Sequence, residues 1–189
     1  MKKVLLIVIA VCLVAIVGLM TWMFVVQSKR YADVPYTPEQ REALVEICAA
    51  TGEDLADLPA LTKAEWKAKV NHAIGYSAYV ETSNGALLRD DGGRYVGRCY
   101  PMLVVVDGGL AGAAYAAVLL HELVHLVYWY TDERQTEFTA FRLAYESTDP
   151  YMKLAANTIL FGSLQRPAND KYNITGRAIR YLHIGGGEC

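Results

Sequence analysis

A long apolar stretch near the middle of the chain holds three ionisable side chains. Residues 116–130 read AAVLLHELVHLVYWY, and residues 110–130 as a whole have good helix propensity and are apolar on almost every side. This pattern predicts a buried helix over residues 110–130. At about 100° per residue, His121, Glu122 and His125 share one face of that helix. The rest of the fold must pack around this helix, and its polar face must meet another polar group.

The spacing of these three side chains is typical of a metal site. Histidines at positions i and i+4 of a helix lie one turn apart with both imidazoles on the same side, as two ligands of one tetrahedral zinc ion require. Glu122 follows the first histidine, so it would lie close to the metal without binding it and could take a proton from zinc-bound water. We therefore expect His121 and His125 to bind zinc and Glu122 to act as a general base.

A zinc site of this kind needs a third protein ligand and leaves the fourth position to water. Residues 131–147 read TDERQTEFTAFRLAYES and predict a second helix, capped by Asp132. If the two helices form a tight hairpin that turns near Tyr130, His125 lies level with Glu137, which is the expected third ligand. Glu133 would lie about 6 Å nearer the turn, at a rise of 1.5 Å per residue. It is the alternative ligand, or a partner that orients a histidine.

The motif HELVH on one helix, followed by a glutamate in TEFTAF on the next, resembles the zincin metallopeptidases, and among them the gluzincin type. This resemblance covers roughly residues 102–147. It implies a small α+β domain, with a short antiparallel or mixed sheet, an active-site helix and backing helices. It also implies that a zinc ion bound by His121, His125 and Glu137 polarises a peptide carbonyl while Glu122 acts as the base. The strand MLVVVD, residues 102–107, is similar to the zincin edge strand with which an extended peptide pairs.

The first thirty residues differ from the rest of the chain. Residues 4–26 run for 23 residues without a charge between two pairs of basic residues, long enough for a helix to cross a hydrocarbon layer of about 30 Å. An uncleaved single-pass anchor is favoured over a secretory signal, because the apolar run is too long and no small-x-small cleavage site follows it. We therefore expect one transmembrane helix in residues 1–30 and a zincin-like domain in residues 31–189, outside the cytoplasm.

The charge of the chain narrows the class of partner that it can bind. The four basic residues that flank the apolar run leave residues 31–189 with 14 basic and 20 acidic side chains, which argues against a nucleic-acid partner. The expected partner is a peptide or protein substrate, with peptidoglycan peptides as one option, and no oligomeric state is indicated.

The cysteines leave two alternatives open. Cys48 and Cys99 can either form a disulfide or remain free thiols.

Local sequence signals predict further elements. A helix is expected to start at Thr37 and stop at Gly52, another starts at Thr62 with a capping-box glutamate, and a third starts at Asp149 with proline at its first position. Between residues 73 and 107, short aromatic and branched runs separated by SNG and DDGG predict strands joined by hairpin turns.

Two other functions fit parts of this pattern. An intramembrane zinc protease is one alternative, since residues 110–130 are nearly long and apolar enough to span a membrane. The other is a membrane-tethered binding or structural module in which any metal is structural. For a peptidase, a side chain that stabilises the oxyanion is also expected, and the candidates are Tyr128, Tyr172, Tyr181 and His183.

Overall fold

The computed structural model of the chain describes residues 12–19, 38–39, 42, 45–46, 55–83, 89–90, 93–130 and 132–183. The chain divides into two compact units, Met1–Val34 and Pro35–Cys189. In the first unit, residues 12–19 are helical. Within the described ranges, no helix combines the length and the apolar character needed to cross a membrane. The predicted fold class is therefore wrong in its N-terminal transmembrane helix; residues 4–11 and 20–26 of that predicted span lie outside the described residues.

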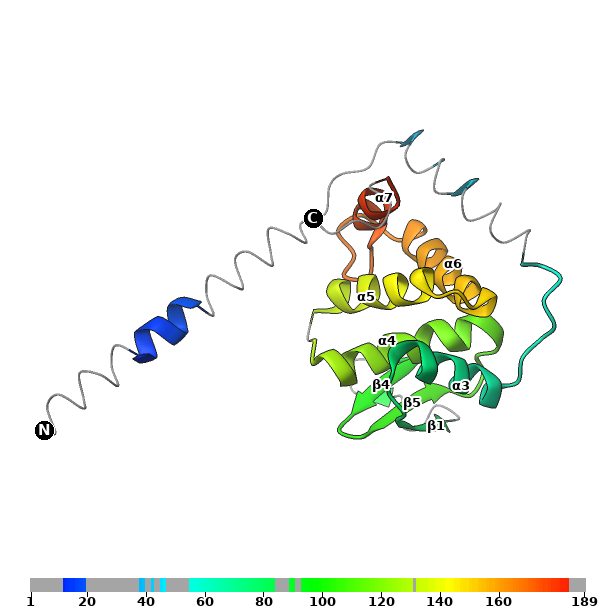
Figure 1. The fold of residues 1–189 in the computed structure, drawn as a ribbon, viewed down its shortest axis with the longest axis horizontal. Helices are drawn as coiled ribbons and strands as arrows, with labels where there is room; N and C mark the ends of the chain where they lie inside the picture. The colour runs from blue at the N-terminus through cyan, green and yellow to red at the C-terminus, as the bar shows by residue number, and fades with distance from the viewer. Residues whose placement is uncertain are drawn as a thin grey trace, which may run out of the picture. The chain divides into compact units, whose positions relative to one another are not determined.

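The second unit combines helices with two small sheets (Figure 1). Thr62, Asp132 and Asp149 each accept a hydrogen bond from a backbone N–H in the first helical turn, which confirms the three predicted helix starts. Of the helix predicted to start at Thr37, residues 38–39, 42 and 45–46 are helical, and the others lie outside the described residues. The longer helices of this unit are α3 (Lys63–Ile74), α4 (Gly112–Tyr128), α5 (Glu133–Glu146), α6 (Pro150–Leu164) and α7 (Thr175–His183).

The strands form one three-stranded mixed sheet and one two-stranded hairpin. In the larger sheet the order is β1-β5-β4, with β1 parallel and β4 antiparallel to β5. Strands β2 and β3 pair antiparallel across the DDGG segment, which confirms the hairpin predicted there, whereas β1 and β2 belong to different sheets, so the hairpin predicted at SNG is wrong. The strands are β1 (Tyr79–Ser83), β2 (Arg89–Asp90), β3 (Gly93–Arg94), β4 (Gly97–Tyr100) and β5 (Leu103–Asp107).

The position of β5 in the sheet corrects one expectation. The strand predicted at residues 102–107 is present as β5, but it lies between β1 and β4 and is paired on both sides. Its backbone N–H and C=O groups are already used in the sheet, so β5 is not an edge strand and has no free edge for a peptide. Its three consecutive valines, Val104 to Val106, are fully buried, as expected for a central strand.

Helix α4 lies at the centre of the second unit. It packs against α3, α5 and α6 and against strands β4 and β5, so it is covered on most sides. In Figure 1 it runs between the three-stranded sheet on one side and α5 with α6 on the other. Leu119, Leu120, Leu123 and Val124 have no exposed surface. This packing explains why the helix is apolar almost all round and confirms that it is buried.

The connection from α4 to α5 begins two residues earlier than the sequence predicts. Helix α4 ends at Tyr128, two residues before the expected end, and Trp129 adopts a left-handed conformation with φ 56°. The backbone N–H of Trp129 closes the helix by donating to the carbonyl of His125. The helical hairpin therefore turns at Trp129, after a helix that ends at Tyr128 rather than near Tyr130. This shift decides which residues of α5 lie opposite the histidines.

Candidate metal centre

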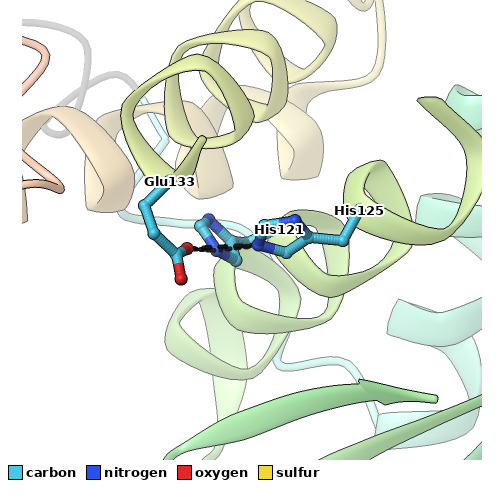
Figure 2. A group of neighbouring side chains, drawn as sticks. All are labelled: His121, His125 and Glu133. Atoms are coloured by element: carbon cyan, nitrogen blue, oxygen red, sulfur yellow. Dashed lines mark hydrogen bonds and ion pairs between the residues drawn. The ribbon is translucent and has the colours of Figure 1, made fainter. Parts of the chain in front are cut away.

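The two histidines of α4 point their Nε2 atoms towards each other and towards the start of α5. The Nε2 atoms of His121 and His125 are 3.1 Å apart. One carboxylate oxygen, Oε2 of Glu133, lies 3.1 Å from each of them. Figure 2 shows this convergence of two imidazoles and one carboxylate. The three side chains form a group that can hold a metal ion.

The Nδ1 atoms on the other side of the two rings have partners of their own. Nδ1 of His121 lies 2.6 Å from Oε2 of Glu137, and Nδ1 of His125 lies 2.7 Å from the carbonyl oxygen of Tyr130. A carbonyl can only accept a hydrogen bond, so Nδ1 of His125 carries a proton and donates. Both rings are thus held through Nδ1 with Nε2 directed at the common point, the arrangement usual for histidine ligands of metals.

The structure gives Glu133 and Glu137 different positions from those expected. Glu133, the alternative in the sequence argument, lies beside the two Nε2 atoms, while Glu137 lies against Nδ1 of His121 and not at the common point. The hairpin that turns around Trp129 sets His125 opposite Glu133 and His121 opposite Glu137. The two glutamates are four residues apart on α5, so both face α4.

The charges of the cluster stabilise one another. Burial alone would lower the pKa of His121, but its hydrogen bonds with Glu133 and Glu137 outweigh that effect and raise the pKa to about 10. The hydrogen bonds with His121 and His125 hold the pKa of Glu133 well below its ordinary value. Positive charge at the common point is therefore favoured, whether protons or a metal ion supply it.

Glu122 lies beside this cluster and is not a member of the ligand group. It is half-buried, and burial raises the pKa of its carboxyl group above the ordinary value. The charges of His121 and His125 lower this pKa and those of Glu133 and Glu137 raise it, so the carboxyl group of Glu122 is electrostatically linked to the candidate ligands. A carboxylate with a raised pKa is suited to accept and release a proton near neutral pH.

Strand β4 passes directly over Glu122 at a glycine. A Cβ atom at Gly97 would lie 2.6 Å from Val118 Cγ1 and 2.8 Å from Glu122 Cγ. Such distances are too short for real side chains, so the close approach of β4 to α4 requires glycine here. Gly97 thus allows an edge strand of the sheet to lie against the general-base candidate.

We predict that Gly97→Ala lowers the free energy of unfolding by about 1–3 kcal/mol, because the added methyl group must push β4 away from α4. The measurement is the thermal unfolding midpoint of the purified variant. Gly162→Ala is the matched control, since a Cβ at Gly162 meets nothing within 4 Å and alanine favours the helix there. Equal midpoints for Gly97→Ala and the unsubstituted protein would contradict the close contact between β4 and Glu122.

The structure also distinguishes among the side chains that are candidates to stabilise the oxyanion. The ring of Tyr172 lies near the cluster, with its centroid 5.8 Å from that of His121. Tyr181 instead donates its hydroxyl to Glu146, and Tyr128 stacks on Tyr130. His183 is the last residue of α7. Of the three tyrosines, Tyr172 is the one with a ring contact to a candidate ligand, and the side chain of His183 lies outside what the structure describes.

Two features of the site have no signal in the sequence. The ammonium group of Lys171 lies 3.4 Å from Oε1 of Glu133, and the carbonyl of Tyr130 orients His125. Lys171 is separated from the glutamate by 38 positions, and a backbone carbonyl occurs in every residue, so the sequence does not mark the one that acts here.

The thiol of Cys99 is free, which settles the alternative left open for it; Cys48 lies outside the described residues.

Comparison of the chain with protein-family models, with curated proteins and with solved structures gave no match. The class of site is defined by its geometry: a candidate metal centre made of two histidines and a glutamate on two antiparallel helices.

Proposed function

We propose that the chain is a zinc-dependent peptidase, with His121, His125 and Glu133 as the metal ligands. The observation that carries this proposal is the spacing of the three donor atoms, which lie 3.1 Å from one another. Ligands at about 2.0–2.1 Å from a tetrahedral zinc ion are separated by about 3.3 Å. The three atoms therefore need to move only a few tenths of an ångström to occupy three corners of such a tetrahedron.

The proposed roles of the remaining groups follow from their positions. A zinc ion in this group would leave a fourth position for water and would polarise the peptide carbonyl. Glu122 takes a proton from the attacking water and passes it to the leaving amine, for which its raised pKa is suited. Glu137 and the Tyr130 carbonyl hold the two imidazoles in place through Nδ1. Tyr172 is the proposed donor to the oxyanion.

The half-buried glutamate also favours a catalytic site over a structural one. Structural zinc sites are closed by four protein ligands, most often cysteines and histidines. Around this cluster the described residues offer two histidines and one glutamate as a ligand group. A structural site would give Glu122 no role, although the burial of its carboxyl group is costly.

We predict that the purified full chain binds one zinc ion and cleaves peptides in a zinc-dependent manner. The measurement is mass spectrometry of a mixed peptide library after incubation with zinc-loaded protein. Removal of zinc with a chelator should abolish cleavage, and added zinc should restore it. Stoichiometric zinc without cleavage of any peptide would contradict the proposed peptidase, and so would cleavage that survives complete metal removal.

Zinc binding is predicted to strengthen as the pH rises. Because the pKa of His121 is raised to about 10, this imidazole holds a proton at pH 7, and a metal ion must displace it. Each displaced proton increases the apparent affinity about tenfold per pH unit. Titration calorimetry at pH 6, 7 and 8, in buffers of different ionisation enthalpy, measures both the affinity and the protons released. An affinity that is constant over this range would contradict the protonated cluster.

A further inference from the structure

The loop between α6 and α7, residues 165–174, brings two cationic side chains next to the candidate metal centre. Lys171 Nζ lies 3.4 Å from Glu133 Oε1, the carboxylate oxygen that does not face the histidines. Lys171 is therefore separated from the metal position by a single carboxylate group. Arg166 and Lys171 both lie over the ring of Tyr172, each at 4.6 Å from its centroid.

This loop is held in place by hydrogen bonds. Arg134, the residue after Glu133, donates to the carbonyl of Asp170 at 2.6 Å. The buried side chain of Asn173 donates to the carbonyls of Arg166 and Pro167. The loop is thus tied both to the first turn of α5 and to itself, so its two cations have defined positions relative to the metal ligands.

Each of these two cations has one carboxylate partner, and a bound metal ion would weaken only the partner of Lys171. Arg166 forms an ion pair with Asp170 at 3.3 Å. Lys171 pairs with Glu133 at 3.4 Å, and a metal ion on Oε2 of Glu133 would draw the negative charge of that carboxylate towards itself. Lys171 would then have the weaker counter-charge. Its side chain is 60% exposed and that of Arg166 is 42% exposed, so both can be reached from solvent.

A cationic group here is unexpected for the chain as a whole. Residues 31–189 carry an excess of acidic side chains, yet the group that adjoins the metal centre contains Arg166 and Lys171. A charged pair beside a reaction site commonly selects substrates of the opposite charge. The chemical group that both a lysine and an arginine bind well in a peptide is a carboxylate.

We infer that the α6–α7 loop binds a carboxylate of the substrate, so that the site selects peptides with a negative charge close to the scissile bond. This inference rests on the proposed peptidase function and adds the substrate class to it. The carboxylate can come from an acidic side chain or from a free C-terminus. Lys171 is the main contact, because it lies nearer the metal centre, and Arg166 supports it.

The test uses zinc-loaded full chain and three peptides built on one cleaved sequence. The first carries Glu near the scissile bond and an amidated C-terminus, the second Gln with an amide, and the third Gln with a free C-terminal carboxylate. We expect one of the two anionic peptides to exceed the neutral peptide about tenfold in kcat/KM, as one charge-assisted contact implies. Which of them does so identifies the source of the carboxylate.

Substitution of Lys171 then assigns the preference to the loop. Lys171→Gln should reduce the anionic-to-neutral ratio of kcat/KM to about 1, and Arg166→Gln should reduce it less. Lys67→Gln, on α3, removes the same charge from an element that contributes no residue to the ligand group, and should keep the ratio. Equal rates on all three peptides would overturn the inference, as would a Lys171→Gln variant that slows all three by the same factor.

A binding measurement separates this inference from the proposed function. The three peptides, built on an arbitrary common sequence if no cleaved one is found, are titrated into zinc-loaded Glu122→Gln, in which cleavage is not needed for the readout. If no peptide is cleaved by the unsubstituted protein but this variant binds an anionic peptide about tenfold more tightly than the neutral one, the carboxylate site stands and the peptidase proposal fails. If peptides are cleaved and all three bind equally, the carboxylate site fails and the peptidase proposal stands.

Discussion

Replacement of Glu122 by glutamine is expected to lower kcat for peptide hydrolysis by roughly 10²–10⁴-fold while the protein still binds one zinc ion. Glutamine has nearly the same shape but cannot accept the proton of the attacking water. Glu122 is not a member of the ligand group, so the metal should remain. The measurement is steady-state hydrolysis together with the zinc content of the same preparation.

The controls for this variant are substitutions of two proposed metal ligands. His121→Ala and His125→Ala should lose both zinc and activity, because each removes a nitrogen from the ligand group. Zinc-loaded Glu122→Gln that cleaves peptides at an undiminished rate would show that this glutamate is not the base. Loss of zinc from Glu122→Gln would instead make it a ligand and contradict the proposed division of roles.

The second large effect is on zinc affinity, which two glutamates of α5 are expected to determine to different extents. Glu133→Gln is expected to weaken zinc binding by more than about 100-fold, because it replaces the carboxylate that meets both Nε2 atoms. Glu137→Gln should weaken it by about 10- to 100-fold, the range typical of residues that orient a ligand through a hydrogen bond. Competition with a zinc-binding dye measures both affinities.

The two variants control each other, since both replace a glutamate of α5 by glutamine and remove one negative charge. The order of the two effects is the decisive result. A zinc affinity that falls further in Glu137→Gln than in Glu133→Gln would restore Glu137 as the third ligand. Equal small losses in both would mean that neither carboxylate binds the metal.

The local features of the fold could be predicted from the sequence because they depend on neighbouring residues. The helix starts at Thr62, Asp132 and Asp149 depend on side chains that bond within one turn. The pairing of His121 and His125 depends on the helical repeat alone. For the same reason, the buried helix and its polar face follow from a short stretch of sequence.

The order of the strands could not be predicted in the same way. Strand β5 pairs with β1 in parallel, and 19 residues of chain separate Ser83 from Leu103. Such pairing depends on how the whole chain packs and has no signature within the strand. The run of branched residues therefore identified β5 as a strand but did not reveal that it lies in the centre of the sheet.

The choice between Glu133 and Glu137 depended on an end of a helix, which is the least predictable part of an element. The expected end of the helix near Tyr130 placed His125 opposite Glu137, whereas α4 ends two residues earlier, at Tyr128, where Trp129 is left-handed. A shift of two residues in the turn moves the facing residue by four positions, one full helical turn. Nothing in the side chain of a tryptophan favours a positive φ, so the sequence carried no warning.

The cations of the α6–α7 loop were beyond sequence reasoning for a different reason. Lys171 meets Glu133 across 38 positions of chain, and the contact depends on how α6 returns the chain to the start of α5. Lysines on acidic chains are common, and their neighbours are determined by tertiary structure. Only the folded arrangement links this residue to the metal centre.

The most direct test of the account is diffraction from crystals of the zinc-loaded protein, recorded at the zinc absorption edge. One anomalous peak is expected at about 2.0–2.2 Å from Nε2 of His121, Nε2 of His125 and a carboxylate oxygen of Glu133. Glu137 should remain on Nδ1 of His121, as it is here at 2.6 Å. A peak bound by Glu137 instead of Glu133, or the absence of any peak between the histidines, would contradict it.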